Sequence, residues 1–222
     1  MRALALSLLA AAVLIGQAAP AKPKPIKLPA PKVGAVALDQ SLKDRKSDRE
    51  LTGPALSVEQ VGQLLWSAQG KNRPGPRGRT VPSASAKYPL ELYVVVSDGS
   101  SLPEGVYKYL LEEHSLLKIK DGSPEKLFGK MERMQPWIPK APAVFIVSGD
   151  SSRMARGSDE LNELYTFWES GAASQSLGLQ VAALGLGSTV VLGVDLKAVH
   201  AAAGLPAGER ISVIIPVGRI AK

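Results

Sequence analysis

Cations and one hydroxyl cluster near the start of the chain, in the segment from Arg45 to Arg49. Arg45, Lys46 and Arg49 lie within five residues of one another, and Ser47 stands between them. Such a mixture of side chains can bind a phosphate group, because guanidinium groups offer paired donors, an ammonium adds a point charge and a hydroxyl adds a short donor. A solvated helix end, where cations favour the helix dipole, has the same composition. The residues alone leave both interpretations open.

A second segment, Pro82 to Ala86, combines a kinked backbone with small side chains. Small side chains let the main chain approach a flat ligand closely, and the hydroxyls of Ser83 and Ser85 can bond its polar rim. Taken alone, however, the segment fits an ordinary serine and alanine loop better than a binding site.

A third short motif, Gly185 to Ser188, gives a weak signal. It follows a predicted helix rather than a strand, and it lacks the third glycine of a dinucleotide-binding fingerprint. A glycine at a helix terminus explains it equally well.

Several kinds of catalysis are excluded by residues that the chain lacks. There is no cysteine, so disulfides, thiol catalysis and thiolate metal sites are impossible. The two histidines, His114 and His200, are far apart in the sequence, and no Ser-His-Asp set or cluster of carboxylates with metal-ligand spacing is visible. We expect no metal site, no catalytic protein side chain, and a surface position for His114.

The first 36 residues differ from the rest of the chain. Residues 1–21 have a positive start, an apolar run and an Ala-Pro-Ala end, which together are typical of a secretory signal peptide cleaved before Lys22. The apolar run is shorter than the roughly 20 residues of a stable membrane span, although a retained N-terminal anchor is the alternative. Residues 22–36 are rich in proline and lysine and predict an extended tether. The protein is therefore expected to be exported, either periplasmic or secreted.

The formal net charge of +7 limits the choice of partner. Part of the excess lies in the tether, and the rest includes residues 43–49 and 71–79. Such a balance suits an anionic ligand or a negatively charged surface. Nucleic acid is a poor fit, because export removes that partner and no basic helix with interleaved aromatic residues is present.

The remaining residues, 37–222, predict one layered domain of strands interspersed with helices. Periodicity alone does not decide whether the class is α+β or α/β. Helices are predicted over 37–46, 56–66, 123–131, 159–184 and 195–204, and strands over 91–96, 105–110, 115–120, 143–147 and 211–217.

Four groups of residues together resemble one known family. They are the segment Arg45 to Leu51, the helix Leu56 to Gly70, the segment Arg79 to Glu91, which reads RTVPSASAKYPLE, and the pairs Trp137-Ile138 and Ala141-Pro142. The combination resembles the FMN-dependent nitroreductase superfamily, specifically its SagB-type dehydrogenase branch. The likeness runs from about Leu28 to Arg219. Each motif alone would be weak, but the set is specific.

The resemblance implies an α+β fold with a central, mainly antiparallel sheet flanked by helices, and a homodimer with FMN at the subunit interface. It implies that Arg45 and Ser47 bind the FMN phosphate, with Arg219 reaching it from the C-terminal end and Lys46 as a helper. The backbone amides of Leu192 and Gly193 should face the flavin N5. Pro82, Ser83 and Ala84 should lie along the isoalloxazine ring, and Ser85 next to them should also bind the cofactor.

The sequence also departs from the family pattern. Ser85 stands where the branch has glycine, Ala86 where other nitroreductases often have a flavin-binding asparagine, and Ser176 where asparagine is common. The stretch between Val147 and Leu161 is short, so the substrate lid is reduced.

The resemblance implies two-electron transfer through bound FMN to or from a small or peptide-derived organic substrate. In such enzymes the cofactor carries the chemistry and the protein positions it. Two alternatives remain, a non-catalytic flavin-binding module and an exported scaffold that has lost FMN.

Overall fold

The computed structural model describes residues 23–99, 102–131, 133–155 and 157–220. The predicted signal peptide lies outside these residues. Within the described ranges, no helix has both the length and the apolar character needed to cross a membrane.

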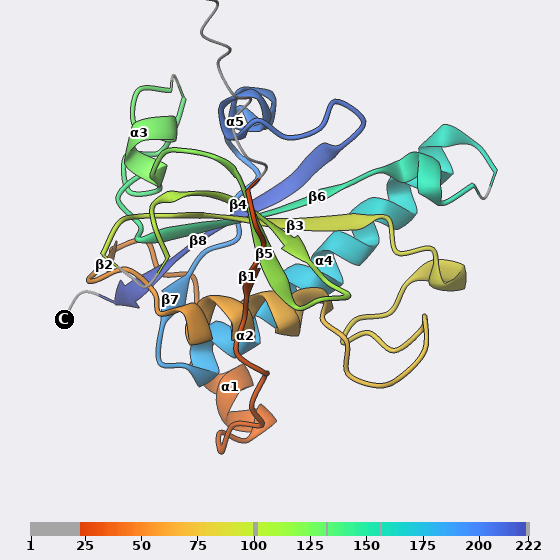
Figure 1. The fold of residues 1–222 in the computed structure, drawn as a ribbon, viewed down its shortest axis with the longest axis horizontal. Helices are drawn as coiled ribbons and strands as arrows, with labels where there is room; N and C mark the ends of the chain where they lie inside the picture. Colours follow the sequence, from red (N-terminus) through yellow and green to blue (C-terminus); the bar gives the residue numbers. More distant parts are fainter. Residues whose placement is uncertain (1–22, 100–101, 132, 156, 221–222) are drawn as a thin grey trace, which may run out of the picture.

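An antiparallel sheet forms the centre of the fold (Figure 1). Among the described residues its strand order is β1-β5-β4-β3-β6-β8-β2, with β7 also paired to β8. The two longest runs of pairing join β3 to β6 and β6 to β8. The strands are β1 Ile26–Lys27, β2 Leu51–Thr52, β3 Leu90–Val96, β4 Gly105–Leu110, β5 Ser115–Lys120, β6 Ala143–Gly149, β7 Gly187–Ser188 and β8 Arg210–Ile220.

The central strands are mostly apolar because both faces of the sheet are covered, although β3 carries Glu91 and β6 carries Ser148. In β3, Leu92 and Val94 pack into one cluster, whereas Tyr93 and Val95 pack into another on the opposite face. This alternation follows from the two-residue period of a strand. The strand predicted over 91–96 therefore contributes side chains to the hydrophobic clusters on both faces of the sheet.

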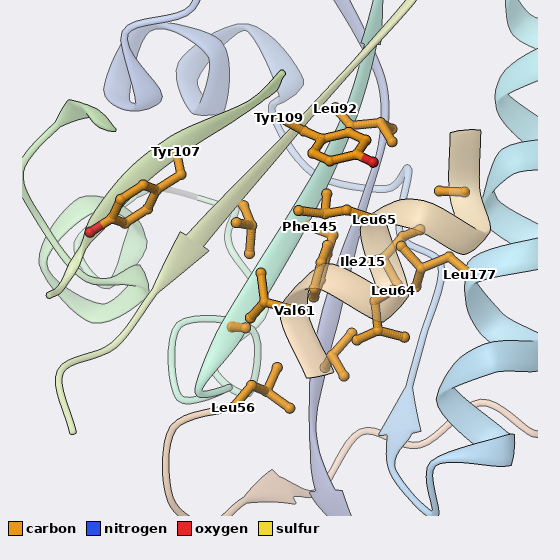
Figure 2. Packing of buried hydrophobic residues seen from close by; sticks show 14 of the residues in the cluster. Leu56, Val61, Leu64, Leu65, Leu92, Tyr107, Tyr109, Phe145, Leu177 and Ile215 are labelled. Atoms are coloured by element: carbon orange, nitrogen blue, oxygen red, sulfur yellow. The ribbon is translucent and has the colours of Figure 1, made fainter. Parts of the chain in front are cut away.

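Helices cover the two faces of the sheet (Figure 1). The lower face in this view carries α1, α2 and α4, and the upper face carries α3 and α5. Figure 2 shows Val61, Leu64 and Leu65 of α2 packed toward Phe145 of β6 and Ile215 of β8. The helices are α1 Leu38–Asp44, α2 Val58–Gln69, α3 Pro124–Phe128, α4 Asp159–Ala183 and α5 Leu196–Ala203. The prediction of an α+β fold with a mainly antiparallel sheet flanked by helices is confirmed.

Local signals set where the helices begin and end. Ser57 accepts a hydrogen bond from the backbone N–H of Gln60, and the side chain of Gln60 accepts one from the N–H of Ser57. This capping box satisfies two otherwise unpaired donors at the start of α2. After α4, Gly185 has a φ of +67°, which reverses the chain toward β7. The interpretation of Gly185 as a helix terminus agrees with this geometry.

The segment that we expected to be a tether is extended, and part of it packs onto the domain. Ile26 and Lys27 pair with β5, and Leu28 is only 3% exposed. Lys32 exchanges two hydrogen bonds with the side chain of Gln63 in α2, at 2.9 and 3.1 Å. Alternate apolar residues allow this stretch to act as an edge strand despite its prolines.

His114, which we expected at the surface, is half-buried instead. Its ring lies between the hydroxyl of Tyr109, 2.8 Å from Nδ1, and the carbonyl oxygen of Pro29, 2.9 Å from Nε2. Burial lowers the pKa of His114. The residue thus connects the β4–β5 turn to the N-terminal segment, a contact that its place in a turn does not reveal.

Candidate functional site

The segment Arg45 to Arg49 follows α1 and lies beside β7. Ser47 forms a parallel bridge with Ser188, and the backbone N–H of Asp48 donates to the carbonyl oxygen of Ser188 at 2.9 Å. The hydroxyl of Thr189 donates to the carbonyl oxygen of Asp48 at 2.6 Å. These bonds fix the backbone of the cationic segment against a strand far away in the sequence.

The same pairing brings Arg219 to this end of the molecule. Gly187 of β7 pairs with Gly218 of β8, and Thr52 pairs with Arg219. A Cβ atom at Gly187 would lie 3.0 Å from the Cβ of Asp48, so glycine is needed for the approach. Ser47 therefore lies beside Ser188 of β7, and Arg219 follows Gly218, which pairs with β7, while the side chain of Arg219 lies against Gly53.

The predicted phosphate donors differ in their availability. Arg45, Ser47 and Arg219 are exposed, and neither arginine forms an ion pair with another described residue. Lys46, in contrast, pairs with Asp48 at 3.3 Å. Of the three predicted cations Arg45, Lys46 and Arg219, Lys46 alone has a carboxylate partner among the described residues.

The loop from Pro82 to Ser85 is anchored by a residue that sequence reasoning missed. Glu169, in the middle of α4, is completely buried. Its Oε1 accepts hydrogen bonds from the hydroxyl of Ser83 at 3.0 Å and from the backbone N–H of Ala84 at 2.8 Å. Glu169 is one of three glutamates in the predicted helix. Since helical glutamates are usually solvated, the sequence did not distinguish it from Glu160 and Glu163.

Burial raises the pKa of Glu169, while its hydrogen bonds to Ala84 and Ser83 and the charge of Arg79 act in the opposite direction. Its second oxygen, Oε2, is buried and has no hydrogen-bond partner within the described part of the chain. An unpaired buried carboxylate oxygen is costly when charged. Glu169 therefore favours the protonated form more than an exposed glutamate does.

The loop beyond Ala84 has a strained backbone. Ser85, Ala86 and Tyr88 all have positive φ values, of 53°, 54° and 49°. Such a conformation costs an L-residue roughly 1–2 kcal/mol. The hydroxyl of Ser83 offsets part of this cost by accepting from the N–H of Tyr88 at 2.7 Å. The left-handed conformation gives a physical reason why glycine would suit position 85.

Leu192 and Gly193 follow the bridge between Val191 and Ile214. Both residues are exposed and line an open cavity of about 1020 Å³. Nothing lies within 4 Å of a Cβ atom built on Gly193, so the space beside its Cα atom is open. A flat ligand can approach the backbone closely at such a glycine.

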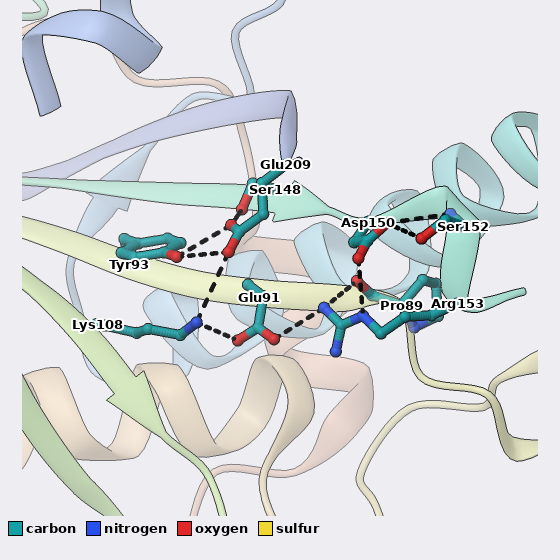
Figure 3. Close-up of polar contacts among 9 residues, drawn as sticks. All are labelled: Pro89, Glu91, Tyr93, Lys108, Ser148, Asp150, Ser152, Arg153 and Glu209. Carbon is teal, nitrogen blue, oxygen red and sulfur yellow. Dashed lines mark hydrogen bonds and ion pairs between the residues drawn. The ribbon is translucent and has the colours of Figure 1, made fainter. Parts of the chain in front are cut away.

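A buried polar network fixes the sheet beside this cavity (Figure 3). Glu209, which precedes β8 and also lines the cavity, accepts from the hydroxyls of Tyr93, at 2.9 Å, and Ser148, at 2.6 Å. Lys108 lies between Glu209, at 3.6 Å, and Glu91, at 3.2 Å. Burial and the neighbouring carboxylate of Glu209 raise the pKa of Tyr93. The network holds the start of β8 in place, and the sequence offered no motif that predicts it.

The three predicted parts of the flavin site lie along α4, but not on one of its faces. Arg45 approaches Gly178, the Pro82–Ser85 loop contacts Glu169, and Leu192 lines a cavity with Phe167. At 3.6 residues per turn, Phe167 and Gly178 are about three turns apart and share a face. Glu169 and Gly178 are about two and a half turns apart and face opposite ways. Within one chain, the loop is thus separated from the other two parts.

Comparison with known proteins agrees with this arrangement of elements and motifs. The model of the Nitroreductase family matches residues 42–219. A protein of Methanocaldococcus jannaschii that is named as a nitroreductase is 35% identical over 162 residues, which cover 72% of this chain and 81% of that protein.

Solved structures show the same fold. A nitroreductase-like protein of Ralstonia eutropha gives a TM-score of 0.77 at 27% identity, covering 90% of this chain and 95% of that one. A chain in the Escherichia coli microcin synthetase McbBCD complex, solved with truncated pro-MccB17 bound, gives a TM-score of 0.64 at 18% identity, covering 97% of this chain and 85% of that one. The fold is therefore nitroreductase-like, and the chain belongs to the Nitroreductase family of oxidoreductases.

Proposed function

We propose that this protein is an FMN-dependent oxidoreductase of the SagB-type dehydrogenase branch. The observation that supports the proposal is that β7 pairs both with Ser47 and with β8, the strand that carries Arg219, although more than 170 residues separate Arg45 from Arg219. Two guanidinium groups that form no ion pair with a described carboxylate, together with a hydroxyl, would form a donor set for a phosphate monoester.

The other parts of the proposed flavin site are placed relative to these phosphate donors. Leu192 and Gly193 lie on the same side of α4 as Arg45, and their accessible amides would face the flavin ring. Bound FMN would accept two electrons from a donor and pass them to an acceptor. The chain itself would bind and orient the flavin, and Glu169 would hold the Ser83–Ala84 backbone in place.

A homodimer completes the site in this proposal. Because the Pro82–Ser85 loop lies on the opposite side of α4 from Arg45, a second copy would have to supply the loop. The first half of α4 exposes large apolar side chains, with Leu164 62%, Phe167 53% and Trp168 60% exposed. An apolar patch of this kind is typical of an interface between subunits.

The substrate class is proposed from the branch. The McbBCD complex, one chain of which shares the fold, was solved with truncated pro-MccB17 bound, and we propose a peptide-derived or small organic substrate here. We also propose export, from the character of residues 1–21. Nicotinamide nucleotides are scarce outside the cytoplasm, so a quinol, another flavoprotein or the substrate itself would then be the electron donor.

The visible absorption spectrum of the purified protein, residues 22–222, tests the proposal. We expect flavin absorption bands and release of FMN on denaturation. The Arg45→Ala/Arg219→Ala double variant should lose the bands, because both phosphate donors are removed, whereas Lys140→Ala, an exposed cation elsewhere, should keep them. A protein that stays colourless after FMN is added would refute the proposal.

Turnover separates the enzyme from a non-catalytic flavin-binding module. The strained Ser85–Ala86 backbone and the absence of an amide side chain at position 86 favour that second candidate. Electron transfer from a quinol or a nicotinamide to a quinone or a nitroaromatic compound would support the enzyme. Tight binding of FMN without any such electron transfer would support the non-catalytic flavin-binding module.

A further inference from the structure

The loop from Asn72 to Tyr88 lines a pocket that has no part in the phosphate site described above. Its volume is about 600 Å³. Arg73, Arg77 and Arg79 all contribute to the lining, and no carboxylate does. The remaining lining residues are Asn72, Thr80, Val81, Pro82, Ser83, Ser85, Ala86 and Tyr88.

The pocket is preorganised by bonds within the loop. The backbone N–H of Asn72 donates to the carbonyl oxygen of Gly78 at 3.0 Å. The hydroxyl of Tyr88 donates to the carbonyl oxygen of Arg77 at 3.1 Å. A Cβ atom at Gly78 would lie 2.0 Å from the carbonyl oxygen of Arg73, so only glycine allows this path of the chain. A basic loop held in this way pays little ordering entropy when a ligand binds.

Arg79 lines the pocket and is partly buried. Its guanidinium carbon stands 4.0 Å from the centre of the Tyr88 ring, and its Nε is buried without a hydrogen-bond partner among the described residues. Burial lowers the pKa of Arg79, yet an arginine remains charged in a protein. An unpaired buried donor on a cation calls for an acceptor.

The carboxylates near Arg79 already have other partners. Glu112 pairs with Lys71 at 3.0 Å. Glu91 pairs with Lys108 and Arg153. Glu169 directs Oε1 to Ser83 and Ala84. No ion pair joins Arg73, Arg77 or Arg79 to a carboxylate of the described chain. The positive charge of the pocket is thus left for a ligand.

We propose that this arginine pocket binds the oxyanion group, a carboxylate or a phosphate, of an acidic substrate. The inference rests on the proposed function, because Pro82, Ser83 and Ser85 belong both to the pocket and to the loop assigned to the flavin ring. Three guanidinium groups recognise an oxyanion through charge-assisted hydrogen bonds. The volume matches a small organic molecule, whose reacting part would extend from the pocket toward the flavin.

Titration calorimetry on the FMN-loaded protein tests the inference with three probes that share a 4-nitrophenyl ring. They are 4-nitrobenzoate, 4-nitrophenyl phosphate and the neutral 4-nitrobenzamide. At low ionic strength we expect at least one acidic probe to bind about tenfold more tightly than the amide, as charge-assisted hydrogen bonds predict. The preference should shrink as salt is added. Comparison of the two acidic probes distinguishes a carboxylate from a phosphate.

The Arg73→Gln/Arg77→Gln variant removes two exposed guanidinium groups and leaves the partly buried Arg79 in place. We expect it to abolish most of the preference for the acidic probe, whereas Lys140→Gln should retain it. The inference is wrong if the preference is absent, if it survives the double variant, or if the acidic probe binds only after FMN is removed. The flavin spectrum of each sample tests the proposed function separately. If the protein takes up no FMN, the same titration on the flavin-free protein still decides whether the oxyanion pocket exists.

Discussion

Glu169 shows how one side chain joins stability to the candidate site. It connects the centre of α4 to the loop that holds Ser83 and Ala84, and it does so without any exposure to solvent. Buried donors left without an acceptor cost about 1–3 kcal/mol. The loop is strained at Ser85, Ala86 and Tyr88, so it depends on this anchor more than a relaxed loop would.

The first prediction at this scale compares Glu169→Ala with Glu169→Gln. The alanine variant should lose about 2–4 kcal/mol of unfolding free energy, since two donors lose their acceptor and a cavity forms. The glutamine variant should recover most of this loss, because its amide oxygen can still accept both bonds. Urea unfolding measures the difference, and equal losses in the two variants would contradict the anchoring role.

The pH dependence of the same pair gives an independent check. The pKa of Glu169 is raised in the folded protein above its ordinary value of 4.5. A raised pKa means that the folded state binds the proton more tightly, so stability declines as the pH rises through the folded pKa. Glutamine has no proton to lose, so Glu169→Gln should gain stability relative to the natural protein as the pH rises above 4.5. A constant difference from acid to neutral pH would refute the raised pKa.

At the scale of the elements, the N-terminal segment behaves as part of the sheet. Edge strand β1 covers β5, and Leu28 fills a space near Gly62 of α2. His114 adds a hydrogen bond to the carbonyl oxygen of Pro29. The segment therefore contributes to folding as well as to the connection with residues upstream.

Leu28→Ala and Val33→Ala test this contribution within one segment. Leu28 is 3% exposed and Val33 is 101% exposed. Deleting a buried leucine side chain costs about 2–5 kcal/mol, whereas an exposed substitution changes stability by less than about 0.5 kcal/mol. Thermal or urea unfolding should therefore separate the two variants clearly. Similar stability of the two would mean that the segment is only loosely attached.

At the scale of the whole molecule, the placement of the site along α4 makes the assembly the central question. The proposed phosphate donors and the Pro82–Ser85 loop lie on opposite faces of one helix. The exposed Phe167 and Trp168 directly precede Glu169 in the same helix. An assembly that buries these side chains would also bring the two halves of a flavin site together.

Phe167→Asp/Trp168→Asp should therefore convert the proposed homodimer to a monomer and release FMN, although Arg45, Ser47 and Arg219 are untouched. Light scattering after size exclusion reports the mass, and the absorption spectrum reports the flavin. Ile119→Asp, which charges an exposed apolar position on β5, is the control and should change neither. A dimer that persists with full FMN content in the double variant would place the interface elsewhere.

The sequence by itself determined the local structure and the family. The central strands and the helix over 56–66 were predicted close to where the structure has them, and the motif set from Arg45 to Pro142 predicted the fold family. These features are readable because periodicity, capping and short motifs are properties of neighbouring residues.

Only the tertiary structure decided which distant residues meet. The contact of Ser83 with Glu169, the place of β7 between Ser47 and β8 and the burial of His114 each depend on strand register and helix packing. A register shift by one residue would turn each strand side chain to the other face, so no local pattern specifies these meetings. The motifs thus identified the parts of the candidate site, and the packing around α4 decided on which side of the helix each part lies.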